Sequence, residues 1–347
     1  MPLPLRSKEL AFSGPVVRGA WGKDVRRVQE WLCLNGHAVA VVGAFESATE
    51  AALRAFCTAR GLPASGVVDG AMFEALSAPM RHTLADLGDL PDGIGGMVVA
   101  VAKRHEEENP REVGGQNRGP WVRPYMDGHE GSDWPRCAGF VSFVIHQACV
   151  ALGRHMPFPK TYSCDTLAAN AQKRNLFTAE RYIDRSDAAS SLAPGTIFLS
   201  WRVSGDWTHT GIVTAAGEET FATIEGNTND EGSREGHEVC TRTRGYGNRD
   251  FVLLSRWRPL SYAQARPDME WRNVAALEGA FEVTSRLPNE FGGTSTVPVS
   301  RRLEGFSTAV GSRVPSAACA TDVVDPVAVR VTCYGCPRWL PAPYTSA

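Results

Sequence analysis

The periodicity of the apolar residues changes once along this chain, and that change constrains the fold class. Before about residue 193, apolar residues recur at the three- and four-residue spacing of helices. After it come short runs rich in β-branched and aromatic residues, at 196–201, 208–215, 220–225 and 251–257. Helices followed by strands favour an α+β domain in which the helices pack on an antiparallel sheet.

The first 80 residues predict a separate small helical domain. Apolar residues recur at helical spacing after Asp24, after Ser47 and after Asp69. Ser47 begins a Ser-x-x-Glu sequence typical of a capping box, and Asp69 is a candidate N-cap. Prolines and glycines after this segment predict a linker. We therefore expect a three-helix domain at 14–80, a linker at 81–96 and a second domain at 97–260.

The composition excludes several classes of protein. Hydrophobic residues make up 43% and charged residues 21%, as in soluble globular proteins. The 36 Lys and Arg residues are balanced by 38 Asp and Glu residues without a long basic run, which argues against a nucleic-acid partner. The longest apolar stretches are too short to span a bilayer, so we expect no integral membrane contact. The charged, proline-containing N-terminus does not match a secretory signal, which predicts synthesis in the cytoplasm.

Nine cysteines are scattered along the chain without the dense spacing of a disulfide scaffold. This pattern predicts mostly free thiols. Cys333 and Cys336 form a Cys-x-x-Cys pair, but a structural zinc site needs four ligands, and the surrounding segment adds only Cys319. We therefore expect no metal and no cofactor, and interpret 264–347 as a weakly structured tail of unknown role.

A cysteine at the predicted start of a helix is the strongest candidate for chemistry. Pro135 and the small residues after Cys137 place this thiol in the first helical turn. There, free N–H donors and the helix dipole favour thiolate. His209 lies 72 residues later, at the start of a predicted strand. Together these two residues supply the nucleophile and the base that thiol catalysis requires.

A hairpin between two predicted strands brings an acceptor beside that histidine. If the chain turns about Gly217, His209 and Glu225 become cross-strand neighbours about 5 Å apart at Cβ. Asn227 then faces the same way. We therefore predict that Glu225 orients His209, with Asn227 as a second orienting group. In this arrangement Cys137 attacks, and His209 serves first as base and then as acid.

Other residues near these motifs have weaker signals. Trp134 and Trp207 flank the cysteine and histidine motifs, and we predict that they line a substrate groove. Acidic residues at 127–133 precede the cysteine, but their spacing lacks the pattern of an EF-hand, which favours a solvated loop over a calcium site.

The N-terminal segment resembles the peptidoglycan-binding-like domain common in bacterial and phage wall hydrolases. The resemblance covers about a sixth of the chain and implies that this domain binds peptidoglycan; the alternative is a helical mini-domain with no ligand. The positions that carry it are mostly core and turn residues: 22–25, Gln29, Leu32, Gly43, Phe45, Thr49, Phe56, 61–62 and 66–69.

The three chemical motifs resemble those of the cysteine, histidine-dependent amidohydrolase/peptidase family, known as the CHAP domain. They occur in the family's order, at 134–141, 209–213 and 224–229. The resemblance spans about 97–257 and implies a papain-like fold that hydrolyses amide bonds in peptidoglycan. Thr196 stands where the family's Pro-Gly-Asp strand entry has an aspartate.

These resemblances predict a peptidoglycan hydrolase, with its place of action at the bacterial cell wall after release or delivery. The bond is either the N-acetylmuramoyl-L-alanine amide or an amide of the peptide stem or crossbridge, and the protein is either a phage endolysin or a wall-lytic effector. One alternative is a catalytically inactive wall-binding protein. Another is an NlpC-type cysteine peptidase, although that family usually has histidine as its third member, where this chain has Glu225.

Overall fold

The structure is a computed structural model, and it describes residues 8–87, 91, 93–228 and 236–258, with the backbone of three later strands. The chain divides into two compact units, one spanning residues 3–259 and the other containing 260–347. In the second unit, β9 (Phe281–Pro288) lies between β10 (Thr294–Val299) and β11 (Arg330–Cys333) and is antiparallel to both. These strands lie where the sequence predicts a weakly structured tail. The rest of that segment, with Cys319 and Cys336, lies outside the described residues.

The N-terminal domain contains the helical segments that the sequence predicts. A two-stranded antiparallel ladder, β1 with β2, joins the beginning of the domain to the turn before α3. Asp69 caps α3, because its carboxylate accepts a hydrogen bond from the Met72 backbone N–H at 2.8 Å. The elements are α1 (Lys23–Leu34), α2 (Ser47–Arg60), α3 (Gly70–Leu76), β1 (Val16–Val17) and β2 (Val67–Val68).

The capping box predicted at the start of α2 is absent. Glu46 occupies the N-cap position, so Ser47 is already the first helical residue, and no side chain caps the helix. The carboxylate of Glu50 instead forms an ion pair with Arg54 one turn later, at 2.8 Å. The prediction was wrong because an i,i+4 ion pair competes for the same carboxylate.

Helices extend into both ends of the predicted linker. Helix α4 spans Ala78–Leu84 and α5 spans Gly93–Glu107. Pro79 starts α4, since a proline in the first turn gives up an N–H that has no helical partner. Gly95 permits close packing, because a Cβ there would lie 2.3 Å from the carbonyl oxygen of Pro194. Pro79 therefore begins a helix, and Gly95 permits a close contact between α5 and the segment before β4, although from the sequence both residues indicate a linker.

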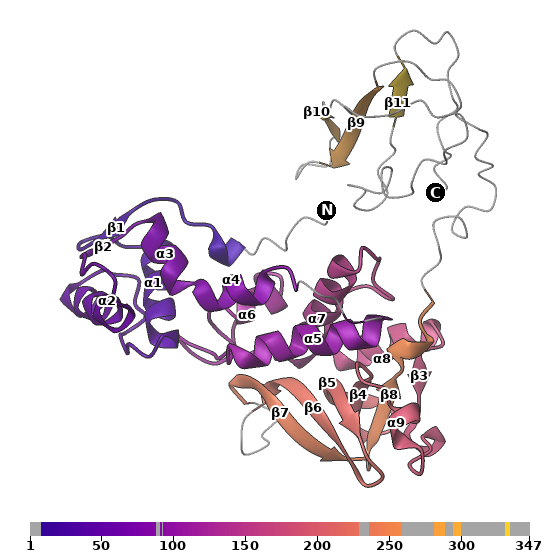
Figure 1. Cartoon of the computed structure of the whole chain (residues 1–347). Coiled ribbons are helices and arrows are strands. Elements are labelled where there is room, and N and C mark those ends of the chain that lie inside the picture. Colours follow the sequence, from indigo (N-terminus) through magenta and orange to yellow (C-terminus); the bar gives the residue numbers. More distant parts are fainter. Residues whose placement is uncertain are drawn as a thin grey trace. The chain divides into compact units, whose positions relative to one another are not determined.

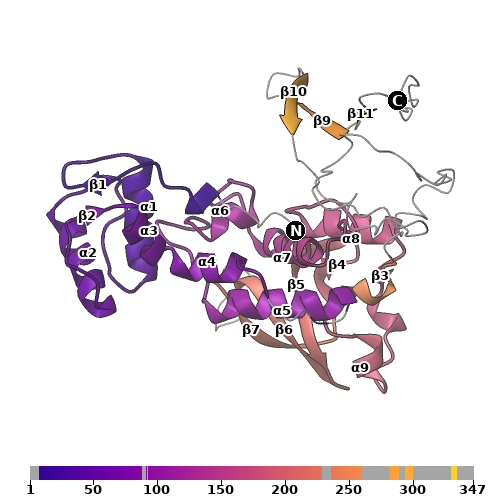
Figure 2. The ribbon, with the colours of Figure 1, turned by 45° about the horizontal axis from the view of Figure 1, so that its top comes forward.

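A six-stranded antiparallel sheet forms the second half of the unit, with strand order β3-β8-β4-β5-β6-β7. Helices α5 and α7 pack against each other and against β5 and β6 (Figure 1 and Figure 2). This is the predicted arrangement of helices on an antiparallel sheet. The bounds are β3 (Phe177–Thr178), β4 (Ile197–Val203), β5 (Asp206–Ala216), β6 (Thr220–Thr228), β7 (Glu238–Gly245), β8 (Arg249–Val252), α6 (Val122–Tyr125), α7 (Cys137–Ala151), α8 (Cys164–Lys173) and α9 (Ala188–Ser191).

The register of the β5–β6 hairpin differs from the predicted one by two residues. Ile212 pairs with Ile224, and a bulge follows before the turn. The turn is centred on residues 218 and 219, because the N–H of Gly217 donates to the Thr220 carbonyl at 2.8 Å. A shift by two residues keeps every side chain on its face of the sheet, whereas a shift by one would reverse them all.

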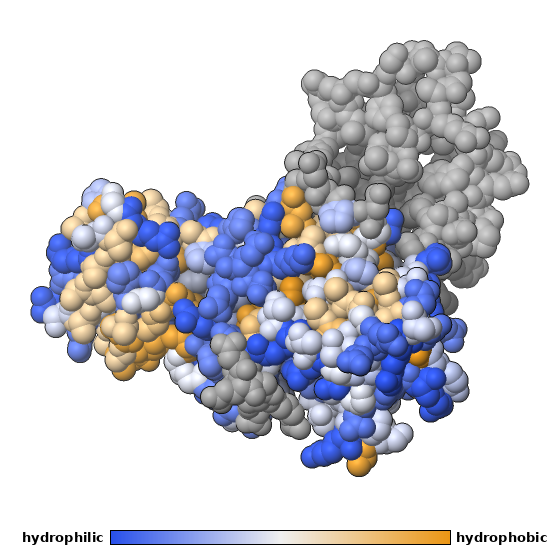
Figure 3. All heavy atoms as spheres, turned by 60° about the horizontal axis from the view of Figure 1, so that its bottom comes forward, coloured by the Kyte–Doolittle hydropathy of each residue, from blue (hydrophilic) through white to orange (hydrophobic). Residues whose placement is uncertain are grey.

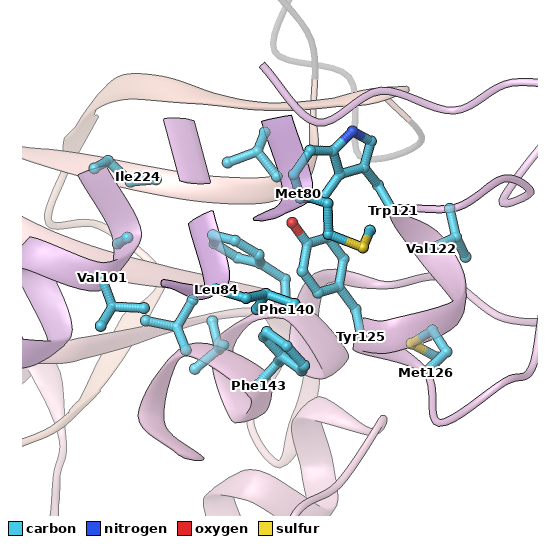
Figure 4. Close-up of a cluster of buried hydrophobic side chains, with 14 of the residues drawn as sticks. Met80, Leu84, Val101, Trp121, Val122, Tyr125, Met126, Phe140, Phe143 and Ile224 are labelled. Carbon is cyan, nitrogen blue, oxygen red and sulfur yellow. The ribbon is translucent and has the colours of Figure 1, made fainter. Parts of the chain in front are cut away.

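The helical domain and the sheet domain share one hydrophobic core. Trp31 of α1 contacts Trp121 edge to face, with ring centroids 6.0 Å apart. Figure 4 shows Trp121 and Tyr125 beside Phe140 of α7 in a cluster that also contains Met80 and Ile224. Ion pairs join the domains as well, since Arg123 of α6 bonds to Glu30 of α1 at 2.6 Å. The domains are therefore packed together rather than tethered.

Exposed apolar side chains occur on the N-terminal domain. Trp21 is 85% exposed and Val42 is 69% exposed. Figure 3 shows apolar surface on this domain, at the left of the molecule, and a mostly hydrophilic surface over the sheet domain. Within the described part of the chain, no helix has the length and apolarity needed to cross a membrane.

Candidate active site

Cys137 is the first residue of α7 and lies at the helix end where N–H groups are free. The backbone N–H of Ala138 helps to lower the pKa of the Cys137 thiol. Gly139 lets this end of the helix approach α6, because a Cβ there would lie 2.8 Å from the carbonyl oxygen of Tyr125. The thiol is 5% exposed. The sequence thus places a buried sulfur at the positive end of a helix dipole.

His209 and Glu225 form a buried hydrogen-bonded pair on adjacent strands. His209 Nε2 lies 2.7 Å from Glu225 Oε2, and Glu225 is fully buried. This bond makes Nε2 the donor, so Nδ1 of the neutral ring is left as an acceptor. Nδ1 is buried and has no hydrogen-bond partner of standard geometry among the described residues, and the ring also interacts with the Cys137 thiol.

The electrostatics of this group favour a thiolate and an imidazolium. The hydrogen bond with Cys164 lowers the pKa of Cys137; burial opposes the charge, and the interaction with His209 lowers the pKa further, to well below its usual range. Burial disfavours a charged imidazole, but the interactions with Cys137 and Glu225 raise the pKa of His209 to about 9. The two shifts have opposite signs, as expected for an ion pair.

Glu225 accepts hydrogen bonds at both carboxylate oxygens. Arg244 of β7 forms a bidentate pair with it, at 2.8 and 2.6 Å, and the Thr223 hydroxyl donates to Oε1 at 2.6 Å. Burial opposes the negative charge, but the bonds from Arg244 and His209 lower the pKa of Glu225 to about 2. The acceptor beside His209 is therefore an ionised carboxylate across the ordinary pH range.

Arg244 and Thr223 were missed from the sequence. Arg244 lies on β7, a strand that the sequence analysis did not identify because it carries few apolar residues. The alternation of β-branched residues with arginines in 238–245 is the signal that would have found it. Thr223 precedes Glu225 by two residues, so both side chains lie on one face of β6.

Asn227, near the end of β6, contacts the residue that precedes Cys137. It adopts a left-handed backbone conformation, with φ of 59°, and its side-chain oxygen accepts a hydrogen bond from Arg136 at 3.3 Å. Arg136 is buried, forms an ion pair with Glu112, and directly precedes Cys137. The sequence predicts Asn227 as a second orienting group for His209, and the structure links it to the segment that begins α7.

The two tryptophans are half-buried in different surroundings. Trp134 stacks on His129 with ring centroids 4.1 Å apart and contacts Tyr162 edge to face. Trp207 donates its indole N–H to Asp250 at 3.0 Å. Cavities of about 380 and 250 Å³ lie elsewhere in the described part of the chain, and neither of these two is lined by Cys137, His209 or either tryptophan. A role for these tryptophans in substrate binding stays a prediction.

Two carboxylates of the acidic loop before Cys137 form ion pairs with neighbouring cations. Lys160 bonds to Asp127 at 2.5 Å, and Arg123 bonds to Glu130 at 3.0 Å. Among the residues that the structure describes, no group of three or more His, Cys, Asp or Glu side chains is arranged to hold a metal ion. The cysteines whose side chains the structure describes are not joined in disulfides: Cys33, Cys57, Cys137, Cys149, Cys164 and Cys240.

Residues 22–76 match a protein family described as "Putative peptidoglycan binding domain". The match covers α1, α2 and α3, the same helices that carry the sequence resemblance. It indicates a function related to the cell wall, with peptidoglycan as the partner of this domain. Neither the curated proteins nor the solved structures contain a match to the chain.

Proposed function

We propose that this protein is a peptidoglycan hydrolase that cuts an amide bond with Cys137 as the nucleophile. The observation that carries the proposal is the arrangement around His209. One ring nitrogen bonds to the buried carboxylate of Glu225 at 2.7 Å, and the ring also interacts with the Cys137 thiol. A thiol, a base and an acceptor that fixes the base are the parts that thiol-based acyl transfer requires.

In the proposed reaction, the Cys137 thiolate attacks the carbonyl carbon of the amide. The backbone N–H of Cys137, free at the start of α7, donates to the oxyanion that develops. The His209 imidazolium gives its proton to the leaving amine, and a thioester remains. His209 then removes a proton from water, which attacks the thioester; the carboxylic acid product and the Cys137 thiolate separate, and the thiolate–imidazolium pair is restored. Glu225 keeps the imidazole in one tautomer throughout.

The substrate follows from the N-terminal domain. A domain that holds peptidoglycan would bring the wall polymer to the nucleophile, which supports the cell wall as the place of action. The bond is the N-acetylmuramoyl-L-alanine amide or an amide of the stem peptide or crossbridge. The protein acts after release or delivery from the cytoplasm, as a phage endolysin or a wall-lytic effector. Its CHAP-like catalytic residues are Cys137, His209 and Glu225.

The test is clearance of purified sacculi, with mass spectrometry of the released muropeptides. We expect Cys137→Ala and His209→Ala to abolish clearance, and Glu225→Gln to lower the rate by a factor on the order of 10³. Cys149→Ser, at a buried thiol farther along α7, is the matched control and should keep the activity. Clearance by Cys137→Ala at the original rate would exclude the mechanism. Wall binding without any new amine would identify an inactive binding protein.

A further inference from the structure

A second cysteine lies beside the nucleophile and has no part in the reaction proposed above. The sulfur of Cys164 lies 3.7 Å from the sulfur of Cys137. Cys164 is the first residue of α8, which Ser163 caps by accepting a hydrogen bond from Thr166. Both thiols are buried, at 5% and 7% exposure. Two helices thus begin with their first side chains in contact.

The two sulfurs are close to bonding distance. A disulfide has a sulfur–sulfur bond of about 2.05 Å, so the sulfurs of Cys137 and Cys164 need to approach by less than about 2 Å. Each cysteine is the first residue of its helix, and neither lies on a strand of the sheet. The two sulfurs therefore come together at the ends of two helices.

The described thiols differ in reactivity. Cys137 has thiolate character because its hydrogen bond with Cys164 and its interaction with His209 lower the pKa of its thiol, as described above. Burial raises the pKa of Cys149 to about 12 and that of Cys240 to about 11, which keeps both thiols protonated. Because the thiolate is the form that oxidants attack, oxidation should begin at Cys137.

We infer that Cys137 and Cys164 form an oxidation site, at which hydrogen peroxide converts the nucleophile reversibly into a disulfide. The Cys137 thiolate attacks one peroxide oxygen, the O–O bond breaks, and the leaving hydroxide takes the proton that Cys137 gave to His209, so the sulfur becomes a sulfenic acid and one water is released. The Cys164 sulfur then attacks the Cys137 sulfur, the S–O bond breaks, and the leaving hydroxide takes the Cys164 proton. In total, two thiols and one peroxide give one disulfide and two waters.

The disulfide protects the nucleophile as well as blocking it. Without a neighbouring thiol, a sulfenic acid is oxidised further to sulfinic acid, which thiol reductants do not reverse. Cys164 captures the sulfenic acid before that step, and a reductant then restores both thiols. The block of wall hydrolysis rests on the proposed function, whereas formation of the disulfide does not.

The test is peptide mapping by mass spectrometry, without reduction, of the full chain treated with hydrogen peroxide. We expect a peptide pair joined through Cys137 and Cys164, and full recovery of Cys137 alkylation after dithiothreitol. In Cys164→Ser, Cys137 should instead become sulfinic acid, and alkylation after reduction should recover on the order of tenfold less. Cys33→Ser, at a half-buried thiol of the N-terminal domain, is the control and should behave like the original chain.

Two results would overturn the inference: linkage of Cys137 to a different cysteine, or sulfinic acid at Cys137 to the same extent with and without Cys164. The map of the unaltered chain decides the linkage even if Cys164→Ser does not fold. A reversible disulfide in a protein that never clears sacculi would refute the proposed function alone. Clearance without the disulfide would refute this inference alone.

Discussion

Gly211 and Glu225 lie against each other on adjacent strands, and the contact leaves no room for a side chain at position 211. A Cβ there would lie 2.6 Å from Cγ of Glu225 and 2.7 Å from the ring of Phe198. The side chain of Glu225 therefore packs directly on the backbone of β5, and its carboxylate bonds to His209. A glycine two residues after the histidine is therefore part of what positions the acceptor.

Gly211→Ala should displace the Glu225 carboxylate and lower sacculus clearance by roughly tenfold or more, since small misplacements of catalytic groups are costly. Overpacking should also lower the free energy of unfolding by about 1–3 kcal/mol. Gly245→Ala is the control, because a Cβ at that position meets no atom within 4 Å. Equal activity of the two variants, measured with thermal denaturation of each, would contradict this role for Gly211.

Arg244→Met should reduce clearance by roughly 10- to 100-fold, because a hydrogen bond to a charged group contributes about 1.5–3 kcal/mol. The change removes the bidentate pair that holds Glu225, while the histidine and cysteine remain. Arg202→Met, at an exposed arginine of β4, is the control. If both variants keep the original rate, Glu225 does not depend on Arg244 for its position.

The inactivation of Cys137 by iodoacetamide should continue at pH values well below those at which an ordinary thiol reacts, because its pKa is lowered. Hydrolysis should fall as the pH rises through about 9, where His209 loses the proton that the leaving amine needs. His209→Ala should move the alkylation profile to higher pH, since the imidazolium no longer stabilises the thiolate. An unchanged profile in that variant would show that the two groups are not paired.

Trp21→Ala should weaken retention on sacculi by roughly tenfold, the usual effect of removing an aromatic anchor from a binding surface. Trp21 is 85% exposed and adjoins the segment that matches the peptidoglycan-binding family. Tyr182→Ala, a comparably exposed aromatic of the sheet domain, is the control. Sedimentation with sacculi measures both, and equal retention would place the binding surface elsewhere.

Arg123→Met should lower the free energy of unfolding by about 3 kcal/mol, because it leaves the buried carboxylate of Glu30 without its closest cation. Burial opposes the charge of Arg123, but its bonds with Glu9 and Glu30 raise its pKa, so the arginine stays charged. Arg18→Met, at an arginine 67% exposed, should change the stability by less than about 0.5 kcal/mol. Urea denaturation distinguishes the two expectations.

Much of the fold could be predicted because local signals and tertiary structure agree. The helices of the N-terminal domain, the helix that begins at Cys137 and the strands that carry His209 and Glu225 all have clear apolar periodicity. The prediction that His209 and Glu225 share one face of the sheet is correct although the predicted hairpin register is wrong, because the register differs by an even number of residues.

What could not be predicted depends on contacts between distant segments. Cys164 follows Cys137 by 27 residues and is at the start of another helix, and no local pattern indicates that their sulfurs touch. Gly95 looks like part of a linker until the close approach of Pro194 explains it. Arg244 lies on a polar strand whose only strong signal is alternation. Each of these residues has a role that depends on contact with a residue far away in the sequence, and spacing along the sequence does not indicate such a contact.

The edge-to-face contact of Trp31 with Trp121, together with the shared core, removes the freedom that a hinge would give. For the proposed hydrolase, a glycan strand gripped by the helical module would present its scissile bonds at one fixed reach from the anchoring point. The spacing of cuts along the polymer would then be set by the fixed distance between the binding surface of the helical module and the nucleophile.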